Sequence, residues 1–188
     1  MEIVERIRKY VEDECRKETN IYGMNAFNHH FVLVAKYAWF LADRTWADKE
    51  IVLISAWLHD IWSILWDYEN HHLTSAQVAE NILSEMRYPR DRIERIKHCI
   101  IAHRWSKSIP RETLEAECIA DADAMSHLNN IDSLFFLALT VRKKSPEDAR
   151  VFVKEKMMQG YNKLTQWAKD LMKNKYDACM LTLDDSLF

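Results

Sequence analysis

Residues 51–61 read Ile-Val-Leu-Ile-Ser-Ala-Trp-Leu-His-Asp-Ile. A helix with this sequence would be apolar on nearly every face, so we expect it to run through the protein core. The segment nevertheless ends in an adjacent imidazole and carboxylate, His59 and Asp60. A buried carboxylate without a partner is costly, and something cationic must offset it. A divalent metal ion binds imidazole nitrogen and carboxylate oxygen together, so the pair predicts a metal site.

Glycine is scarce in this chain of 188 residues, with only Gly23 and Gly160 present. Strand-rich folds and nucleotide-binding βαβ folds need glycine at their turns, so its scarcity argues against both. Helical periodicity dominates instead and predicts an all-α fold. We expect one domain over residues 1–188, with its core at about 25–140 and C-terminal helices at about 145–175 packing on that core.

The periodicity also predicts where the helices lie. We expect helices at about residues 3–15, 28–44, 47–61, 74–87, 93–103, 110–125, 133–142 and 146–175. The charged stretch at 154–175 is interpreted as a solvated helix face, and residues 177–188 remain ambiguous.

Charge and composition limit the partners of the chain. A net charge of -3 provides no basic face for a nucleic-acid polymer. The four cysteines are isolated in sequence, which is typical of a reducing compartment. The chain starts without a signal-peptide pattern, and no apolar run reaches the roughly 18 residues that span a bilayer. We therefore expect a cytoplasmic protein with no membrane partner; a homodimer is compatible with the sequence.

Further histidines lie on or near apolar helix faces. His30 precedes Val34 by one turn, and His103 follows Ile100 by one turn, so both imidazoles point inward. His71 lies just before an expected helix start. A single inward histidine is usually a hydrogen-bonded core residue. Several in one domain, together with His59, favour a shared function.

Two aspartates compete on the helix expected at 110–125. Asp123 shares an apolar face with Ile119 and Ala120, whereas Asp121 fits a face formed by Cys118 and Met125 nearly as well. Helix geometry alone leaves both aspartates open as candidate ligands.

Five short elements follow one another along the chain: His30-Phe-Val-Leu-Val34, Ala56-Trp-Leu-His-Asp-Ile61, His71-His-Leu-Thr-Ser-Ala76, Ile100-Ile-Ala-His103 and Ala122-Asp-Ala-Met125. In this order they resemble the H…HD…H…H…D signature of the HD-domain superfamily of metal-dependent phosphohydrolases. The resemblance covers about residues 25–140 and favours Asp123 over Asp121. It implies an all-α bundle of the HD-domain type.

The resemblance also implies a metal centre with one or two divalent ions. Asp60 would bridge the two ions and serve as the catalytic carboxylate. Nitrogen and oxygen ligands without thiolate are compatible with iron, manganese, cobalt, nickel, zinc or magnesium. The implied ligands are His30, His59, Asp60 and Asp123 for the first ion, and Asp60, His71 and His103 for the second.

The implied reaction is hydrolysis of a small phosphorylated substrate, a nucleotide or another phosphoester, by metal-activated water. Arg104 and Lys107 follow His103 closely and are candidates for binding substrate phosphates.

One departure from the family motif favours a different function, because Trp62 and Ser63 follow His-Asp-Ile where many relatives have glycine and lysine. Arginines found in relatives are likewise replaced by Leu33 and Ala124. A catalytically weak or inactive metal-binding sensor or scaffold is therefore the alternative, and a helical interaction module with purely structural histidines is a third.

Overall fold

The computed structural model describes residues 1–65, 70–104 and 109–184. These residues contain helices and no strand, which confirms the all-α prediction. None of their helices is both long enough and apolar enough to cross a membrane. The helices are α1 (Glu2–Cys15), α2 (Met24–Ala26), η1 (a π-helix, Phe27–Phe31), α3 (Val32–Thr45), α4 (Lys49–Leu58), α5 (Ile61–Leu65), α6 (His71–Glu85), α7 (Arg90–Ala102), α8 (Leu114–Asn129), α9 (Ile131–Phe136), η2 (a π-helix, Leu137–Val141), α10 (Pro146–Lys163) and α11 (Gln166–Leu183).

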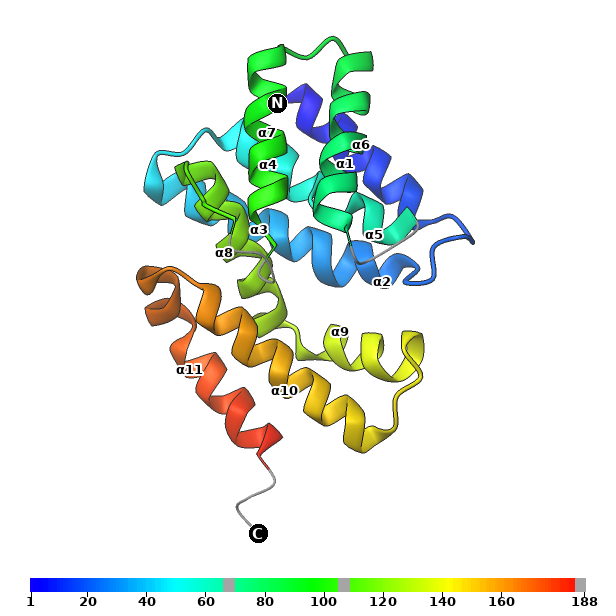
Figure 1. Cartoon of the computed structure of the whole chain (residues 1–188), viewed down its shortest axis with the longest axis vertical. Helices are drawn as coiled ribbons and strands as arrows, with labels where there is room; N and C mark the ends of the chain where they lie inside the picture. The colour runs from blue at the N-terminus through cyan, green and yellow to red at the C-terminus, as the bar shows by residue number, and fades with distance from the viewer. Residues whose placement is uncertain (66–69, 105–108, 185–188) are drawn as a thin grey trace.

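Helix α8 connects the two halves of the molecule (Figure 1). The upper half in that view contains α1, α4, α6 and α7, and the lower half contains α9, α10 and α11. Helix α8 packs against α3, α4 and α7 on one side and against α10 and α11 on the other. The C-terminal helices α10 and α11 therefore pack on the same helix that carries the Ala122–Met125 element.

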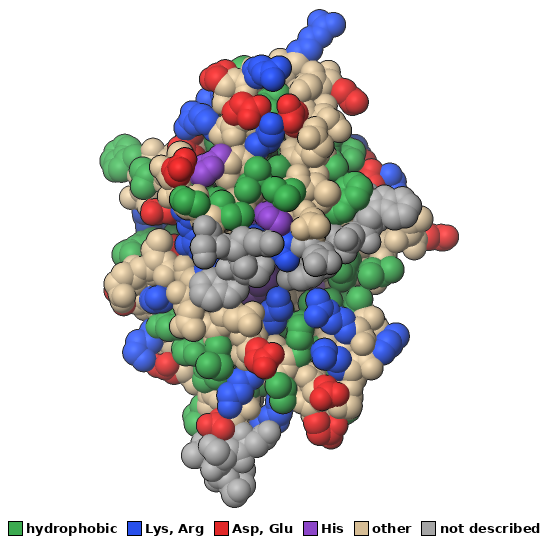
Figure 2. Space-filling model, viewed as in Figure 1, with side chains coloured by type: hydrophobic (Ala, Val, Ile, Leu, Met, Phe, Trp, Pro, Cys, Tyr) green, Lys and Arg blue, Asp and Glu red, His purple; other side chains and the backbone are tan. Residues whose placement is uncertain are grey.

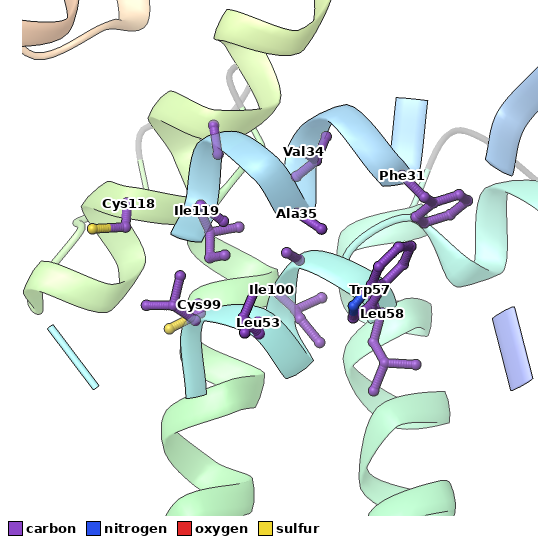
Figure 3. Packing of buried hydrophobic residues seen from close by; sticks show 14 of the residues in the cluster. Phe31, Val34, Ala35, Leu53, Trp57, Leu58, Cys99, Ile100, Cys118 and Ile119 are labelled. Atoms are coloured by element: carbon purple, nitrogen blue, oxygen red, sulfur yellow. The ribbon is translucent and has the colours of Figure 1, made fainter. Parts of the chain in front are cut away.

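Helix α4 is the buried helix that the apolar sequence predicts. Its start is capped by Asp48, whose carboxylate accepts hydrogen bonds from the backbone N–H groups of Glu50 and Ile51. Every residue from Ile51 to Leu58 is buried. Figure 3 shows Leu53 and Leu58 of this helix among apolar side chains from the surrounding helices. The His-Asp pair therefore follows directly from the most deeply buried helix.

The C-terminal region differs from the expectation of one helix at 146–175. Helix α10 ends at Lys163, because Leu164 takes an extended conformation with φ -60° and ψ 145°. Thr165 then caps α11 by accepting a hydrogen bond from the N–H of Ala168. Helix α11 continues to Leu183, through part of the stretch that the sequence leaves ambiguous. The break places a joint between two helices against α8.

A smaller difference concerns α6, which begins at His71 and not near residue 74. His71 and His72 are therefore in the first turn of the helix, and both are buried. The prediction of a single domain over residues 1–188 remains a prediction.

Candidate metal centre

Asp60 lies at the centre of a group of imidazoles, and its two carboxylate oxygens face different partners. Oδ2 is 3.6 Å from Nε2 of His30 and 3.8 Å from Nε2 of His59. Oδ1 is 3.3 Å from Nε2 of His71 and 3.5 Å from Nε2 of His103. These side chains form two sets of ligand atoms close enough to hold metal ions, and Asp60 belongs to both sets.

Most of these residues lie at helix ends that meet at one point. His59 and Asp60 follow the C-terminus of α4, and His103 follows the C-terminus of α7. His71 is the first residue of α6. His30 lies in the π-helix η1, a wide turn of the kind that often occurs at functional sites. Helix termini are the places where a rigid scaffold can aim polar side chains into its interior.

Hydrogen bonds fix the orientation of two of the imidazoles. The Nδ1 atom of His59 is 2.8 Å from the carbonyl oxygen of Ala56, and Nδ1 of His103 is 2.5 Å from the carbonyl oxygen of Ile100. A carbonyl only accepts, so each Nδ1 is the N–H donor. Each Nε2 of the neutral ring therefore carries a lone pair, as in metal-binding histidines.

The same reasoning applies to His30. The hydroxyl of Ser126 donates to the carbonyl oxygen of Asp123 over 2.7 Å, so its oxygen accepts from Nδ1 of His30 at 3.2 Å. In the neutral ring Nε2 of His30 would likewise carry the lone pair; burial favours that form, but Asp60 and Asp123 raise the pKa of His30 above its usual value. It lies 3.0 Å from Nε2 of His59, so a hydrogen atom or a metal ion between the two nitrogens is needed to join them.

This arrangement fits a divalent cation. The Nε2 atoms of His30 and His59 face each other, and those of His30, His59 and His103 face the carboxylate of Asp60. The Oδ1 atom of Asp60 is buried and accepts no hydrogen bond from the described residues. A divalent metal ion binds imidazole nitrogen and carboxylate oxygen together, and would therefore satisfy both the facing Nε2 atoms and Oδ1 of Asp60.

The pKa values of these groups show the same electrostatic balance. Burial lowers the pKa of His59 to about 3, so this ring is neutral at ordinary pH. Burial alone would raise the pKa of Asp60, but His71 and the other imidazoles around it hold that pKa well below its usual range. Asp60 is therefore an ionised carboxylate next to a neutral imidazole, which is the protonation state that metal ligation requires.

The two aspartates of α8 have different partners. The Oδ1 atom of Asp123 faces His30 and His59, with Nε2 distances of 3.8 and 3.9 Å. Asp121 instead accepts hydrogen bonds from the backbone N–H of Thr165 at 3.0 Å and from its hydroxyl at 2.5 Å. Asp123 thus adjoins the imidazoles, and Asp121 holds the joint between α10 and α11.

We expect Asp121→Ala to destabilise the protein by about 1–3 kcal/mol without changing its metal content, because a buried N–H loses its acceptor. Chemical unfolding and elemental analysis measure the two effects. Asp132→Ala, at a surface position of α9, is the control for both measurements. Loss of metal in Asp121→Ala with unchanged unfolding would reverse the roles of the two aspartates.

Two further residues, which the sequence does not predict as part of the site, also lie at this centre. His127 is not among the ligands expected from sequence, but its Nε2 is 3.4 Å from Oδ1 of Asp123 and its ring stacks on His30 with centroids 4.9 Å apart. Its spacing of four residues from Asp123 is the signal that could have found it. Lys163 belongs to the stretch predicted to be a solvated face; instead it is buried, and its ammonium is 2.6 Å from Oδ2 of Asp123.

A cavity of about 300 Å³ adjoins this centre. Figure 2 shows histidine side chains near the middle of one face, with lysine and arginine side chains gathered just below them. Arg104 lines the cavity and lies 3.0 Å from Nδ1 of His72, whereas Lys107 lies outside the described residues. The lining combines imidazoles and carboxylates (His30, Asp60, His71, His103, Asp123, His127), cations (Arg104, Arg142, Lys156, Lys163) and apolar side chains (Phe31, Leu134, Phe136, Leu137).

Comparison with known proteins agrees with this fold. The HD domain family matches residues 28–128, more than half of the chain, and the protein belongs to that family. An uncharacterized protein of Clostridium beijerinckii is 39% identical over 84 residues, which cover 42% of this chain and 53% of that protein. This chain thus spans about half the length of that curated relative.

A solved structure resembles nearly the whole chain. The crystal structure of Bacillus subtilis YpgQ in complex with ADP superimposes with a TM-score of 0.68 and covers 95% of this chain and 92% of that one. The sequences are 19% identical, so the likeness concerns the fold. It extends beyond the family match to the C-terminal helices.

Proposed function

We propose that this protein is a metal-dependent phosphohydrolase that acts on a nucleotide or another small phosphoester. The observation that carries the proposal is the position of Asp60, whose two oxygens face separate pairs of imidazoles beside an open cavity. Divalent ions in such a centre, when bound, activate water as a nucleophile and neutralise phosphoryl oxygens. Iron, manganese, cobalt, nickel, zinc and magnesium are the candidate ions.

The proposed ligands fall into two sets, one for each ion position. His30, His59 and Asp123 would hold one ion together with Asp60, and His71 and His103 would hold the other. Asp60 is the shared ligand because each of its oxygens faces one set. The hydrogen bonds at Nδ1 of His59 and His103 keep both rings aimed at that carboxylate. Buried Phe31 packs edge-on against His59 and excludes water from behind it.

The cavity supports a substrate that is partly anionic and partly apolar. Arg104 is positioned to bind phosphate oxygens at the edge of the metal centre, and Lys107 is proposed for the same role from sequence alone. Phe136 and Leu137 line the apolar part of the cavity and suit a base or another flat group. YpgQ, which shares the fold, was crystallised with ADP, and this favours a nucleotide among the small phosphoesters.

A direct test combines elemental analysis with a hydrolysis screen. The purified protein should contain a divalent transition metal, and it should release phosphate or pyrophosphate from one or more nucleotides in the presence of manganese, cobalt or magnesium. A protein without metal after purification and reconstitution contradicts the proposal.

One observation favours the alternative of a metal-binding sensor or scaffold. Ser63 stands where many relatives have a lysine, and its hydroxyl is buried beside the cavity without a hydrogen-bond partner among the described residues. A protein that binds metal and nucleotide but hydrolyses none of the screened phosphoesters would favour this alternative.

The second ion position has its own test. We expect His103→Ala to bind about one manganese ion per chain where the parent binds about two, because one set of ligands loses an imidazole. His98→Ala is the matched control, since His98 lies on α7 but accepts a hydrogen bond from the N–H of Glu112. Isothermal titration with manganese gives both stoichiometries. A parent that saturates at one ion, unchanged in His103→Ala, would leave His71 and His103 as cavity residues only.

A further inference from the structure

Lys163 is a buried cation in direct contact with a proposed metal ligand. Its ammonium lies 2.6 Å from Oδ2 of Asp123 and donates a second hydrogen bond to the backbone carbonyl of His103 over 3.2 Å. Only 4% of the side chain is exposed. Lys163 is the last residue of α10 and lies outside residues 28–128, the segment that matches the HD domain family.

The ammonium changes the charge of the centre. Asp60 and Asp123 are the carboxylates that face the imidazoles, and Lys163 offsets one of these two negative charges. The hydrogen bonds at Nδ1 of His59 and His103 leave Nε2 of each ring facing the carboxylate of Asp60. A divalent ion that binds to Oδ1 of Asp123 therefore approaches a carboxylate whose other oxygen is already paired with a cation.

Burial makes this competition strong. Charges away from solvent are poorly screened, so the ammonium and a metal ion would repel one another across the same carboxylate. Lys163 cannot turn away easily, because its second hydrogen bond and the hydrogen bond from Arg111 to its own carbonyl oxygen hold it in place.

We propose that Lys163 is a resident cation that competes with metal for the charge of Asp123, so that the centre binds metal less tightly than its ligands alone would. This inference rests on the metal centre of the proposed function. In the metal-free protein the ammonium compensates a buried carboxylate, and it thereby lets the chain fold before metal binds. The bound ion is correspondingly more exchangeable.

The test is the manganese affinity of Lys163→Met, measured by isothermal titration at fixed pH. We expect the dissociation constant to fall by about tenfold or more, because Asp123 regains its full charge for the ion. The metal-free variant should melt at a lower temperature than the parent, and manganese should restore its stability. Lys163→Arg keeps the charge and should bind manganese as the parent does.

Lys154→Met is the matched control, because Lys154 lies on the same helix in a solvated ion pair with Asp184. If metal-free Lys163→Met does not fold, it is purified with manganese, and more chelator should be needed to remove half of the metal than from the parent. Unchanged or weaker manganese binding in Lys163→Met overturns the inference and assigns Lys163 a packing or orienting role. Failure of manganese to restore the variant also overturns it. A parent that binds no divalent ion contradicts the proposed function itself.

Discussion

Replacing Asp60 by alanine is expected to remove both the bound metal and hydrolysis. Asp60 faces both sets of imidazoles, so its loss opens both ion positions at once. Loss of a residue that merely orients a ligand already costs about 10–100-fold in metal affinity or activity. Removal of the shared ligand should therefore reduce hydrolysis by about 100-fold or more. Elemental analysis and the nucleotide assay measure the two losses.

The same substitution has an opposite effect on the metal-free fold. Asp60 is a partly buried carboxylate whose buried Oδ1 accepts no hydrogen bond from the described residues, and its removal relieves that cost. We expect metal-free Asp60→Ala to be as stable as the metal-free parent, or more stable. Asp43→Ala, in an exposed ion pair with Lys49, is the control. Undiminished metal content in Asp60→Ala would remove the basis of the proposed mechanism.

Phe31→Ala should cost about 3–5 kcal/mol of the free energy of unfolding, the range for a large aromatic side chain removed from a core. Phe31 is fully buried, and its ring lies edge-on to His59 with centroids 5.6 Å apart. Figure 3 shows it beside Trp57 within the apolar cluster. A typical domain has about 5–15 kcal/mol in total, so this loss is a large share.

The loss at Phe31 should also reach the metal centre. Without the Phe31 ring, His59 and the neighbouring His30 lose a packing contact that restrains them. Metal affinity should therefore fall together with stability. Trp46→Ala is the contrasting control, because Trp46 is 95% exposed and its removal should change stability by only about 0.5 kcal/mol. Denaturant unfolding and manganese titration measure both proteins. A cost below about 1 kcal/mol in Phe31→Ala would contradict the packing described for this site.

Much of the fold and of the candidate site follows from local sequence. The all-α fold follows from helical periodicity and from the scarcity of glycine, both of which act over a few residues. The positions of His30, His59 and His103 follow in the same way, because an imidazole placed among apolar residues at helical spacing must point inward. The order of the five elements then indicates the family, and the family match confirms it.

The choice between Asp121 and Asp123 shows where helical periodicity stops being informative. Helix α8 is buried on almost every side, so both aspartates lie on faces with apolar neighbours. Residues two apart point in opposite directions, and each meets a different part of the molecule. Packing of η1 and α4 on α8 brings His30 and His59 to Asp123, and packing of the α10–α11 joint brings Thr165 to Asp121.

The burial of Lys163 and its contact with Asp123 depend entirely on tertiary structure. Local sequence places it in a charged helix, and charged helices are normally solvated. The side chain becomes buried because α10 ends there and the joint with α11 packs on α8, which brings its ammonium to a carboxylate 40 residues away in sequence. The sequence by itself therefore determined the all-α fold, the family and most of the candidate ligands. Only the tertiary structure decided which aspartate meets them and which cation meets that aspartate, because both contacts join helices whose local patterns carry no information about each other.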